Sequence, residues 1–151
     1  ESDRICDHLR TIDSTRVWDA TSGWFKQKSS DVLSLHVYFH PVILEPTEKP
    51  IIISEFGGYS HKILARSYSV HGVYGYGDYD SKEALTDAIS RLYKEEIIPN
   101  LKAGINGSIY TQLSDVEDET NGFLTYDRKE LKVDEKKMQE IAKLIFETWK
   151  S

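Results

Sequence analysis

The sequence predicts an α/β fold built on a parallel sheet. Residues 31–39 and 49–56 are apolar over nearly their whole length. Continuous apolar strands are typical of parallel sheets, because such sheets are covered on both faces. Two long helical patterns in the C-terminal half each accompany a strand, in the βα order that a parallel sheet requires. A length of 151 residues indicates one domain.

The first part of the chain predicts one helix and two strands. Ile5, Leu9 and Ile12 have the spacing of a buried helix face. Cys6, the one cysteine, lies in the same pattern, and we expect a buried and inert thiol. Residues 14–20 then predict a short strand, and residues 31–39 a clearer one.

Residues 49–56 predict the clearest strand of the chain. Pro50 suits a first strand residue, where its missing N–H costs no ladder bond. Residues 57–80 are rich in glycine and tyrosine and have no helical period. Loops of this length in compact domains are functional or disordered, and the aromatic content favours an ordered loop.

The remaining segments predict a helix, a fourth strand, a polar loop and a last helix. Residues 79–98 have a clear helical period, which Asp80 and Glu83 would open as a capping box and Pro99 would end. Residues 106–114 predict the strand. The last helix should begin near Asp134 and bury a stripe made of Met138, Ile141, Ala142, Ile145 and Trp149.

Composition excludes some classes of partner. The formal net charge is −6 and the pI about 5.4, whereas binding to nucleic acid or to an anionic membrane needs a basic surface. No apolar run approaches the length of about 18 residues that a transmembrane helix needs. A single cysteine fits both a reducing compartment and a secreted protein without disulfides, and we favour the cytoplasm.

The candidate catalytic residue is Glu55. It leaves the apolar segment 49–56 and is followed by Gly57 and Gly58, which let a ligand approach the backbone closely. In parallel α/β folds, residues at the carboxyl ends of strands meet at one edge of the sheet. The alternative is a solvated glutamate at the end of a strand.

Further candidates lie near the ends of the other predicted strands. His36 and Tyr38 point to the same face because the strand period is two. A phenol at Tyr38 can donate a hydrogen bond to a carboxylate and hold it ionised, although a packed tyrosine is the alternative. Tyr110 and Gln112 belong to the segment 106–114. No Cys/His cluster accompanies them, so we expect neither a metal nor a cofactor.

Four segments together resemble the C-terminal half of the catalytic barrel of glycoside hydrolase family 2, the β-galactosidase and β-glucuronidase type. The matches spread over nearly all of residues 1–151, which would then be a fragment of a longer chain. The resemblance implies the parallel-stranded half of a TIM (β/α)8 barrel, with four strands and two well-formed following helices. The matching segments, from the fifth to the eighth barrel strand, are "TIDSTRVWDATSGW", "SLHVYFHP", "IIISEFGG" and "SIYTQLSDVEDETNGFLTYDR".

The resemblance also implies an activity, the hydrolysis of O-glycosidic bonds with retention. It makes Glu55 the nucleophile and Tyr38 its hydrogen-bonding neighbour, and it places Tyr110 where the family often has tryptophan. Carbohydrate would be the substrate. With the candidates near the strand ends, the expected substrate-binding residues are Trp24, His36, Tyr38, Tyr110 and Gln112.

The resemblance implies that half of the catalytic machinery lies outside the chain. A retaining glycosidase needs two carboxyl groups about 5–5.5 Å apart, one of them the acid/base. In the family that acid is a Glu preceded by Asn, and the chain contains no such pair. We therefore expect the acid a few residues before Glu1, and little or no activity from these residues alone.

Two other functions and two assembly states remain open. A carbohydrate-binding module would use a tyrosine platform without a carboxylate pair. A non-catalytic structural or interaction domain would have kept the fold and lost the chemistry. The open edges of a four-stranded sheet would favour a homodimer that pairs edge to edge, or a monomer whose loops cover both edges.

Overall fold

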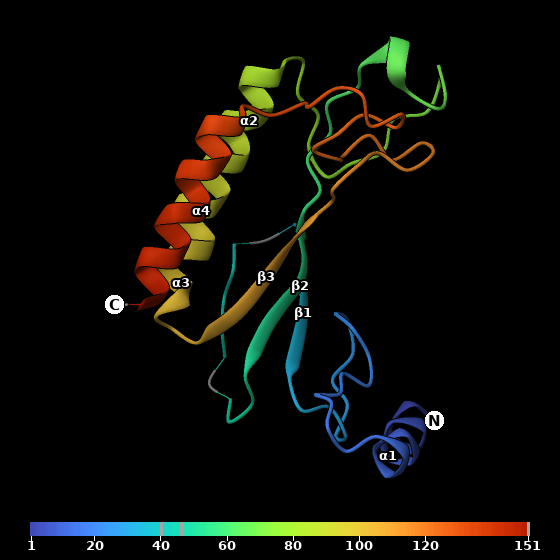
Figure 1. Ribbon diagram of the computed structural model, residues 1–151, viewed down its shortest axis with the longest axis vertical. Coiled ribbons are helices and arrows are strands. Elements are labelled where there is room, and N and C mark those ends of the chain that lie inside the picture. Colours follow the sequence, from blue (N-terminus) through green and yellow to red (C-terminus); the bar gives the residue numbers. More distant parts are fainter. Residues whose placement is uncertain (40, 46, 151) are drawn as a thin grey trace.

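Three parallel strands form the sheet at the centre of the structure. The computed structural model describes residues 1–39, 41–45 and 47–150. Its strands are β1 (Leu33–Val37), β2 (Ile51–Gly57) and β3 (Ile105–Thr111), and they lie in the order β1-β2-β3. Both neighbouring pairs are parallel, so the carboxyl ends of all three strands lie at one edge, where long loops gather (Figure 1).

The helices that follow β2 and β3 lie on one side of the sheet. Helix α2 (Lys82–Leu92) continues through a π-helical turn, Tyr93–Ile97, into α3 (Ile98–Leu101), and α4 (Glu135–Lys150) packs beside them (Figure 1). Helix α1 (Ser2–Ile12) lies apart from them, at the other end of the molecule. No helix in the described part of the chain is long and apolar enough to cross a membrane.

Two apolar clusters hold the helices against the sheet. One joins Ile53 and Phe56 of β2 and Ile105 of β3 to Val42 and Ile97. Burial of such a side chain stabilises the fold by roughly 1.5–3 kcal/mol each. The second cluster joins Leu85 and Ile89 of α2 to Val133, which lies just before α4.

The expected half of a TIM (β/α)8 barrel with four strands is wrong, because the described residues form three strands and no barrel. The missing strand is the segment 14–20. There Trp18 N–H donates to Asp31 Oδ2 at 2.7 Å and Ala20 N–H donates to Ser30 Oγ at 2.9 Å. Side chains therefore take the backbone donors that a strand ladder would need.

The helix boundaries differ from two expectations. Ser81, and not Asp80 with Glu83, caps α2: its Oγ accepts a hydrogen bond from Ala84 N–H at 3.2 Å. Pro99 does not end the helical segment, which runs on to Leu101. Pro99 lies in the first turn of α3, where the missing N–H is tolerated.

The expected buried stripes of α1 and α4 are only partly buried. Ile5 and Ile12 of α1 are 53% and 70% exposed, so the expected buried face of that helix is wrong. In α4 Ile141 is buried, but Trp149 is 65% exposed. Cys6 is 3% exposed, which confirms the expected burial of the thiol.

A buried ion pair fastens the loops above the carboxyl ends of the strands. Lys132 and Asp115 are both buried, and Lys132 Nζ lies 2.6 Å from Asp115 Oδ1. The same ammonium donates to the carbonyl oxygens of His61 and Thr120, each at 2.8 Å. All three of its protons are used, which is the condition for keeping a cation in the interior.

We expect Lys132→Met to lower the free energy of unfolding by about 3–5 kcal/mol, because it leaves the Asp115 carboxylate buried without its cation. Lys137→Met is the control: its ion pair with Asp87 is exposed, and such pairs contribute at most about 1 kcal/mol. Urea unfolding followed by circular dichroism measures both. Equal losses in the two variants would contradict the role given to Lys132.

Candidate functional site

Glu55 lies at a bulge in β2. Leu35 pairs with Ile53, but the next residue of β1, His36, pairs with Glu55, so Ser54 is an extra residue in β2. Bulges of this kind redirect side chains and occur often beside active sites. Because of the extra residue, Ser54 and Glu55 both contact side chains on the face opposite the helices.

The same bulge appears in the pairing with β3. Ile53 pairs with Ser108, and Phe56 pairs with Tyr110, so three steps along β2 correspond to two along β3. Ile53 and Phe56 both pack into the apolar cluster under the helices. One inserted residue thus keeps the core intact and turns a carboxylate away from it.

Two side chains of the β1 end contact one oxygen of Glu55. The Tyr38 hydroxyl donates to Glu55 Oε2 at 2.7 Å, and His36 Nδ1 lies 3.4 Å from the same oxygen. Both contacts confirm that His36 and Tyr38 share a face of the strand. No residue in the described ranges donates to Oε1, and the Glu55 side chain is 45% exposed.

The surroundings of Tyr38 keep its hydroxyl protonated, so that it remains a hydrogen-bond donor. Burial raises the pKa of Tyr38 well above the usual phenol value, and the hydrogen bond to Glu55 also raises it, against a lowering by Thr111. Thr111 Oγ1 lies 2.9 Å from the Tyr38 oxygen. Because the phenol proton points to Glu55, Thr111 is the donor in this second bond. Tyr76 stacks on the Tyr38 ring with a centroid distance of 3.8 Å.

Two exposed aromatic rings contact His36 and Tyr76, which belong to the surroundings of Glu55. The Trp24 side chain is 61% exposed, and its ring contacts the His36 ring edge to face, with 5.6 Å between the ring centroids. Phe39, 69% exposed, meets Tyr76 at 4.9 Å. Gly58 permits the stack of Tyr76 on Tyr38: its φ is +64°, and a Cβ there would come within 2.7 Å of Tyr76. Aromatic faces beside a carboxylate suit a ligand with apolar and hydroxyl surfaces.

Tyr110 lies in the core and not beside Glu55. Its ring stacks on Phe123 at 4.7 Å and meets Phe56 edge to face at 5.6 Å. Its hydroxyl accepts a hydrogen bond from Tyr59 N–H at 3.1 Å. Burial is the largest cause of the raised pKa of Tyr110. The Tyr110 ring, which we expected to stack on a sugar, thus packs against other side chains of the core.

The Gln112 side chain is bonded within the loop after β3. Its Nε2 donates to Glu119 Oε2 at 3.0 Å and to Asn121 Oδ1 at 2.8 Å. The structure therefore brings Glu55, His36 and Tyr38 together with Trp24 beside them, and it connects Gln112 to the acidic loop.

Three features of the site were not predicted from the sequence. The bulge, the Thr111 contact and the Tyr38–Tyr76 stack each depend on how separate segments meet. One signal was present: Ser54 interrupts an otherwise apolar strand directly before Glu55. A polar residue followed at once by a charged one breaks the strand period, as a bulge does.

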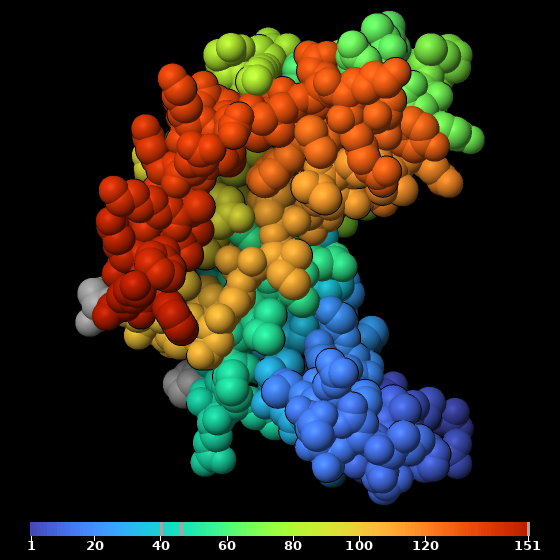
Figure 2. Space-filling model, in the orientation of Figure 1, coloured from blue at the N-terminus to red at the C-terminus, as the bar shows by residue number. Residues whose placement is uncertain are grey.

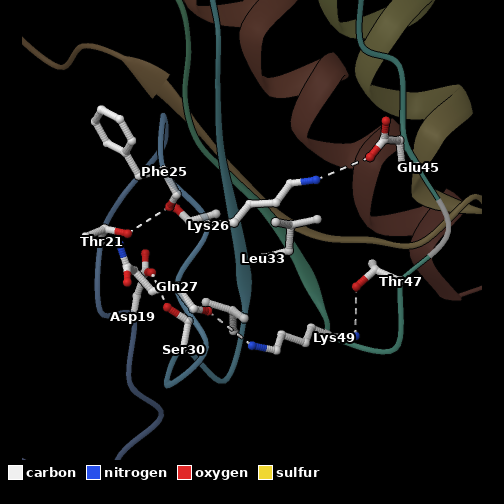
Figure 3. A pocket seen from close by; sticks show the side chains of 12 residues that line it. Asp19, Thr21, Phe25, Lys26, Gln27, Ser30, Leu33, Glu45, Thr47 and Lys49 are labelled. Atoms are coloured by element: carbon white, nitrogen blue, oxygen red, sulfur yellow. Dashed lines mark hydrogen bonds and ion pairs between the residues drawn. The ribbon is translucent and has the colours of Figure 1, made fainter. Parts of the chain in front are cut away.

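A separate pocket of about 220 Å³ lies at the amino end of β1, away from Glu55 (Figure 3). Lys26 Nζ lies 3.2 Å from Glu45 Oε2 there, and Lys49 Nζ donates to the Lys28 carbonyl at 3.1 Å. These cations join the N-terminal segment to the residues before β2, and we assign the pocket no ligand. Among the described residues, no three His, Cys, Asp or Glu side chains are grouped to hold a metal ion.

Known protein families give no model that matches this chain, and no curated protein is significantly similar to it in sequence.

We expect the wild type to be more stable than Tyr110→Phe at neutral pH, and this advantage to shrink or reverse at high pH. At neutral pH the variant loses the bond from Tyr59 N–H, at a cost of about 0.5–1.5 kcal/mol. The pKa of Tyr110 is higher folded than unfolded, so its stabilising contribution is complete below about pH 10 and is lost as the pH rises further. Phenylalanine has no such loss.

Urea unfolding at neutral pH and at about pH 11 measures this difference. The wild type should be the more stable protein at neutral pH, and its advantage should shrink or reverse at high pH. An advantage that stays constant with pH would show that the Tyr110 hydroxyl ionises as easily in the folded as in the unfolded protein, and would contradict the raised pKa.

Proposed function

We propose that this chain carries the nucleophile of a retaining β-glycosidase similar to glycoside hydrolase family 2, and that Glu55 is that nucleophile. The observation that supports the proposal is the arrangement of its two carboxylate oxygens. Oε2 is held by Tyr38 and lies against His36, whereas Oε1 has no donor among the described residues and the side chain is 45% exposed. A carboxylate fixed by one oxygen and open at the other suits attack on an anomeric carbon.

The proposed reaction has two steps. In the first, Glu55 Oε1 attacks the anomeric carbon, and the bond to the leaving oxygen breaks as an acid protonates that oxygen. In the second, the same acid, now a base, takes a proton from water, which attacks the anomeric carbon and releases Glu55. Tyr38 keeps its proton throughout and holds Oε2, because burial raises its pKa far above neutrality.

The acid/base residue is proposed to come from polypeptide outside these residues. The groups that hydrogen-bond or ion-pair with Glu55 among the described residues are Tyr38 and His36, and neither is a carboxyl. General acid catalysis contributes roughly 10²–10⁴ in rate. The 151 residues by themselves are therefore proposed to be inactive or nearly so.

The proposed substrate is carbohydrate, bound across Glu55 by Trp24, His36 and Tyr38. Trp24 supplies an exposed apolar face, whereas the polar atoms of His36 and Tyr38 are directed at Glu55 and hold its carboxylate in place. Tyr110 and Gln112 are not part of this proposed contact surface, because Tyr110 packs in the core and Gln112 is bonded within its loop. The homodimer expected through open sheet edges stays a prediction.

One observation favours a second candidate function, a carbohydrate-binding module. Trp24, Phe39 and Tyr74 are 61%, 69% and 51% exposed, and exposed aromatic rings can bind sugars without catalysis. Calorimetry with oligosaccharides separates the two functions. Tight binding of an oligosaccharide by the 151-residue polypeptide alone, with an affinity that Glu55→Gln leaves unchanged, would favour the binding module.

We expect Glu55→Ala, in a polypeptide that also contains the acid/base residue, to stop hydrolysis of an aryl β-glycoside. Added azide should restore release of the aryl group, because the small anion fits the space of the lost carboxylate and attacks in its place. The product should be a glycosyl azide of inverted configuration, identified by NMR. Glu83→Ala is the control, since Glu83 is an exposed glutamate of α2. Full activity of Glu55→Ala without azide would exclude Glu55 as the nucleophile.

A further inference from the structure

Three consecutive residues of the N-terminal segment surround the His36 ring. Ser22 Oγ lies 3.2 Å from His36 Nε2. Gly23 has a φ of +85°, and a Cβ at this position would collide with the imidazole. Trp24 meets the ring edge to face, with 5.6 Å between the centroids. The His36 imidazole is thus contacted by three successive residues, through a hydroxyl, a glycine backbone and an indole ring.

The serine hydroxyls beside His36 form a chain of defined direction. Ser22 donates to Ser54 Oγ at 2.9 Å, and Ser34 donates to the same oxygen at 2.7 Å. Ser54 donates in turn to the Leu35 carbonyl at 3.3 Å. Because a carbonyl can only accept, every hydroxyl proton in the chain points away from the imidazole.

The direction of this chain determines what Ser22 can do for His36. The Ser22 proton is used toward Ser54, so its oxygen is left to accept a hydrogen bond from His36 Nε2. Nε2 is then a donor in the neutral ring and in the charged ring alike. In the charged ring Nδ1 is a donor as well, and it faces Glu55 Oε2 at 3.4 Å.

The contact also explains how a segment without a strand is attached to the sheet. Residues 13–32 make no ladder with β1, and Figure 2 shows the N-terminal part as a lobe beside the lower half of the molecule. Ser22 reaches both β1 and β2 from this segment, through Ser34 and Ser54. Ser54 is the extra residue of the bulge, so the serine chain lies directly beside Glu55 in sequence.

We propose that Ser22, Gly23 and Trp24 form a positioning element, which fixes the His36 imidazole with Nε2 on Ser22 and Nδ1 toward Glu55. In the charged ring His36 and Tyr38 then both donate to Oε2, which leaves Oε1 as the reacting oxygen. The catalytic meaning of this arrangement rests on the proposed function, but the contacts themselves do not. Ser22 is a positioning residue, since it acts through His36.

The test is NMR of the unliganded chain, labelled with ¹⁵N in histidine and with ¹³C in the glutamate carboxyl groups. Spectra of His36→Gln and Glu55→Gln assign the two signals. In Ser22→Ala we expect a shift of the His36 Nε2 resonance, because its acceptor is lost, and a shift of the Glu55 carboxyl resonance. Ser22→Thr keeps the hydroxyl and should restore both signals to their wild-type positions.

Ser90→Ala is the matched control, because the Ser90 hydroxyl has no hydrogen-bond partner among the described residues. It should leave both resonances unchanged. Gly23→Ala is a second variant: it should displace the imidazole and remove the cross-peak between the Trp24 and His36 rings. Unchanged Nε2 and carboxyl signals in Ser22→Ala would overturn the positioning element.

These signals are read without substrate, so the two proposals fail separately. Shifted resonances in Ser22→Ala together with an active Glu55→Ala would refute the glycosidase and leave the positioning element in place. Unshifted resonances together with azide rescue at Glu55 would refute the positioning element and leave the nucleophile in place.

Discussion

One extra residue in β2 is the constraint on which the site depends. Ser54 lengthens the strand by one position relative to both neighbours. Ile53 and Phe56 can therefore both enter the core, while Ser54 and Glu55 both turn to the opposite face. Without that insertion, the strict alternation of a strand would send Glu55 to the same side as Ile53, where an ionised carboxylate would be unpaired in an apolar cluster.

The residues around the bulge hold the Glu55 carboxylate in a fixed position. Tyr38 donates to one oxygen, and the stack of Tyr76 on Tyr38 restrains the phenol in turn. The loop that brings Tyr76 there is joined to the strand end through Gly58, whose carbonyl accepts a hydrogen bond from Tyr76 N–H at 2.8 Å. The buried Lys132 binds the next layer of loops through three acceptors. The loops above the strand ends are thus held in place by polar contacts.

The sequence predicts the parts of this structure that depend on local pattern. Apolar runs identified the segments of β1 and β2 and favoured a parallel sheet, the strand predicted over residues 106–114 overlaps β3, and Asp134 marked the start of α4 within one residue. The alternation of a strand was enough to place His36 and Tyr38 on one face, and Glu55 was recognised because it ends so apolar a run.

What the sequence did not predict depends on contacts between distant segments. The segment 14–20 has the composition of a strand, but the side chains of Ser30 and Asp31 compete for its backbone donors, and the expected half-barrel is wrong for that reason among others. Tyr110 resembles a ligand-facing residue in sequence, yet it pairs with Phe56 and packs with it in the core. The polar Ser54 directly before Glu55 is the one sign of the bulge within β2, and the pairing with β1 and β3 is needed to establish it.

The most direct measurement is the capture of the covalent intermediate. A 2-deoxy-2-fluoro glycoside with a good leaving group slows release of the sugar more than its attachment, so an ester on the nucleophile accumulates. We expect peptide mass spectrometry of the polypeptide that also contains the acid/base residue to find the sugar on Glu55, within "IIISEFGG". A sugar attached to any other carboxylate, or to none while the aryl glycoside is still hydrolysed, would contradict the proposal that Glu55 is the nucleophile.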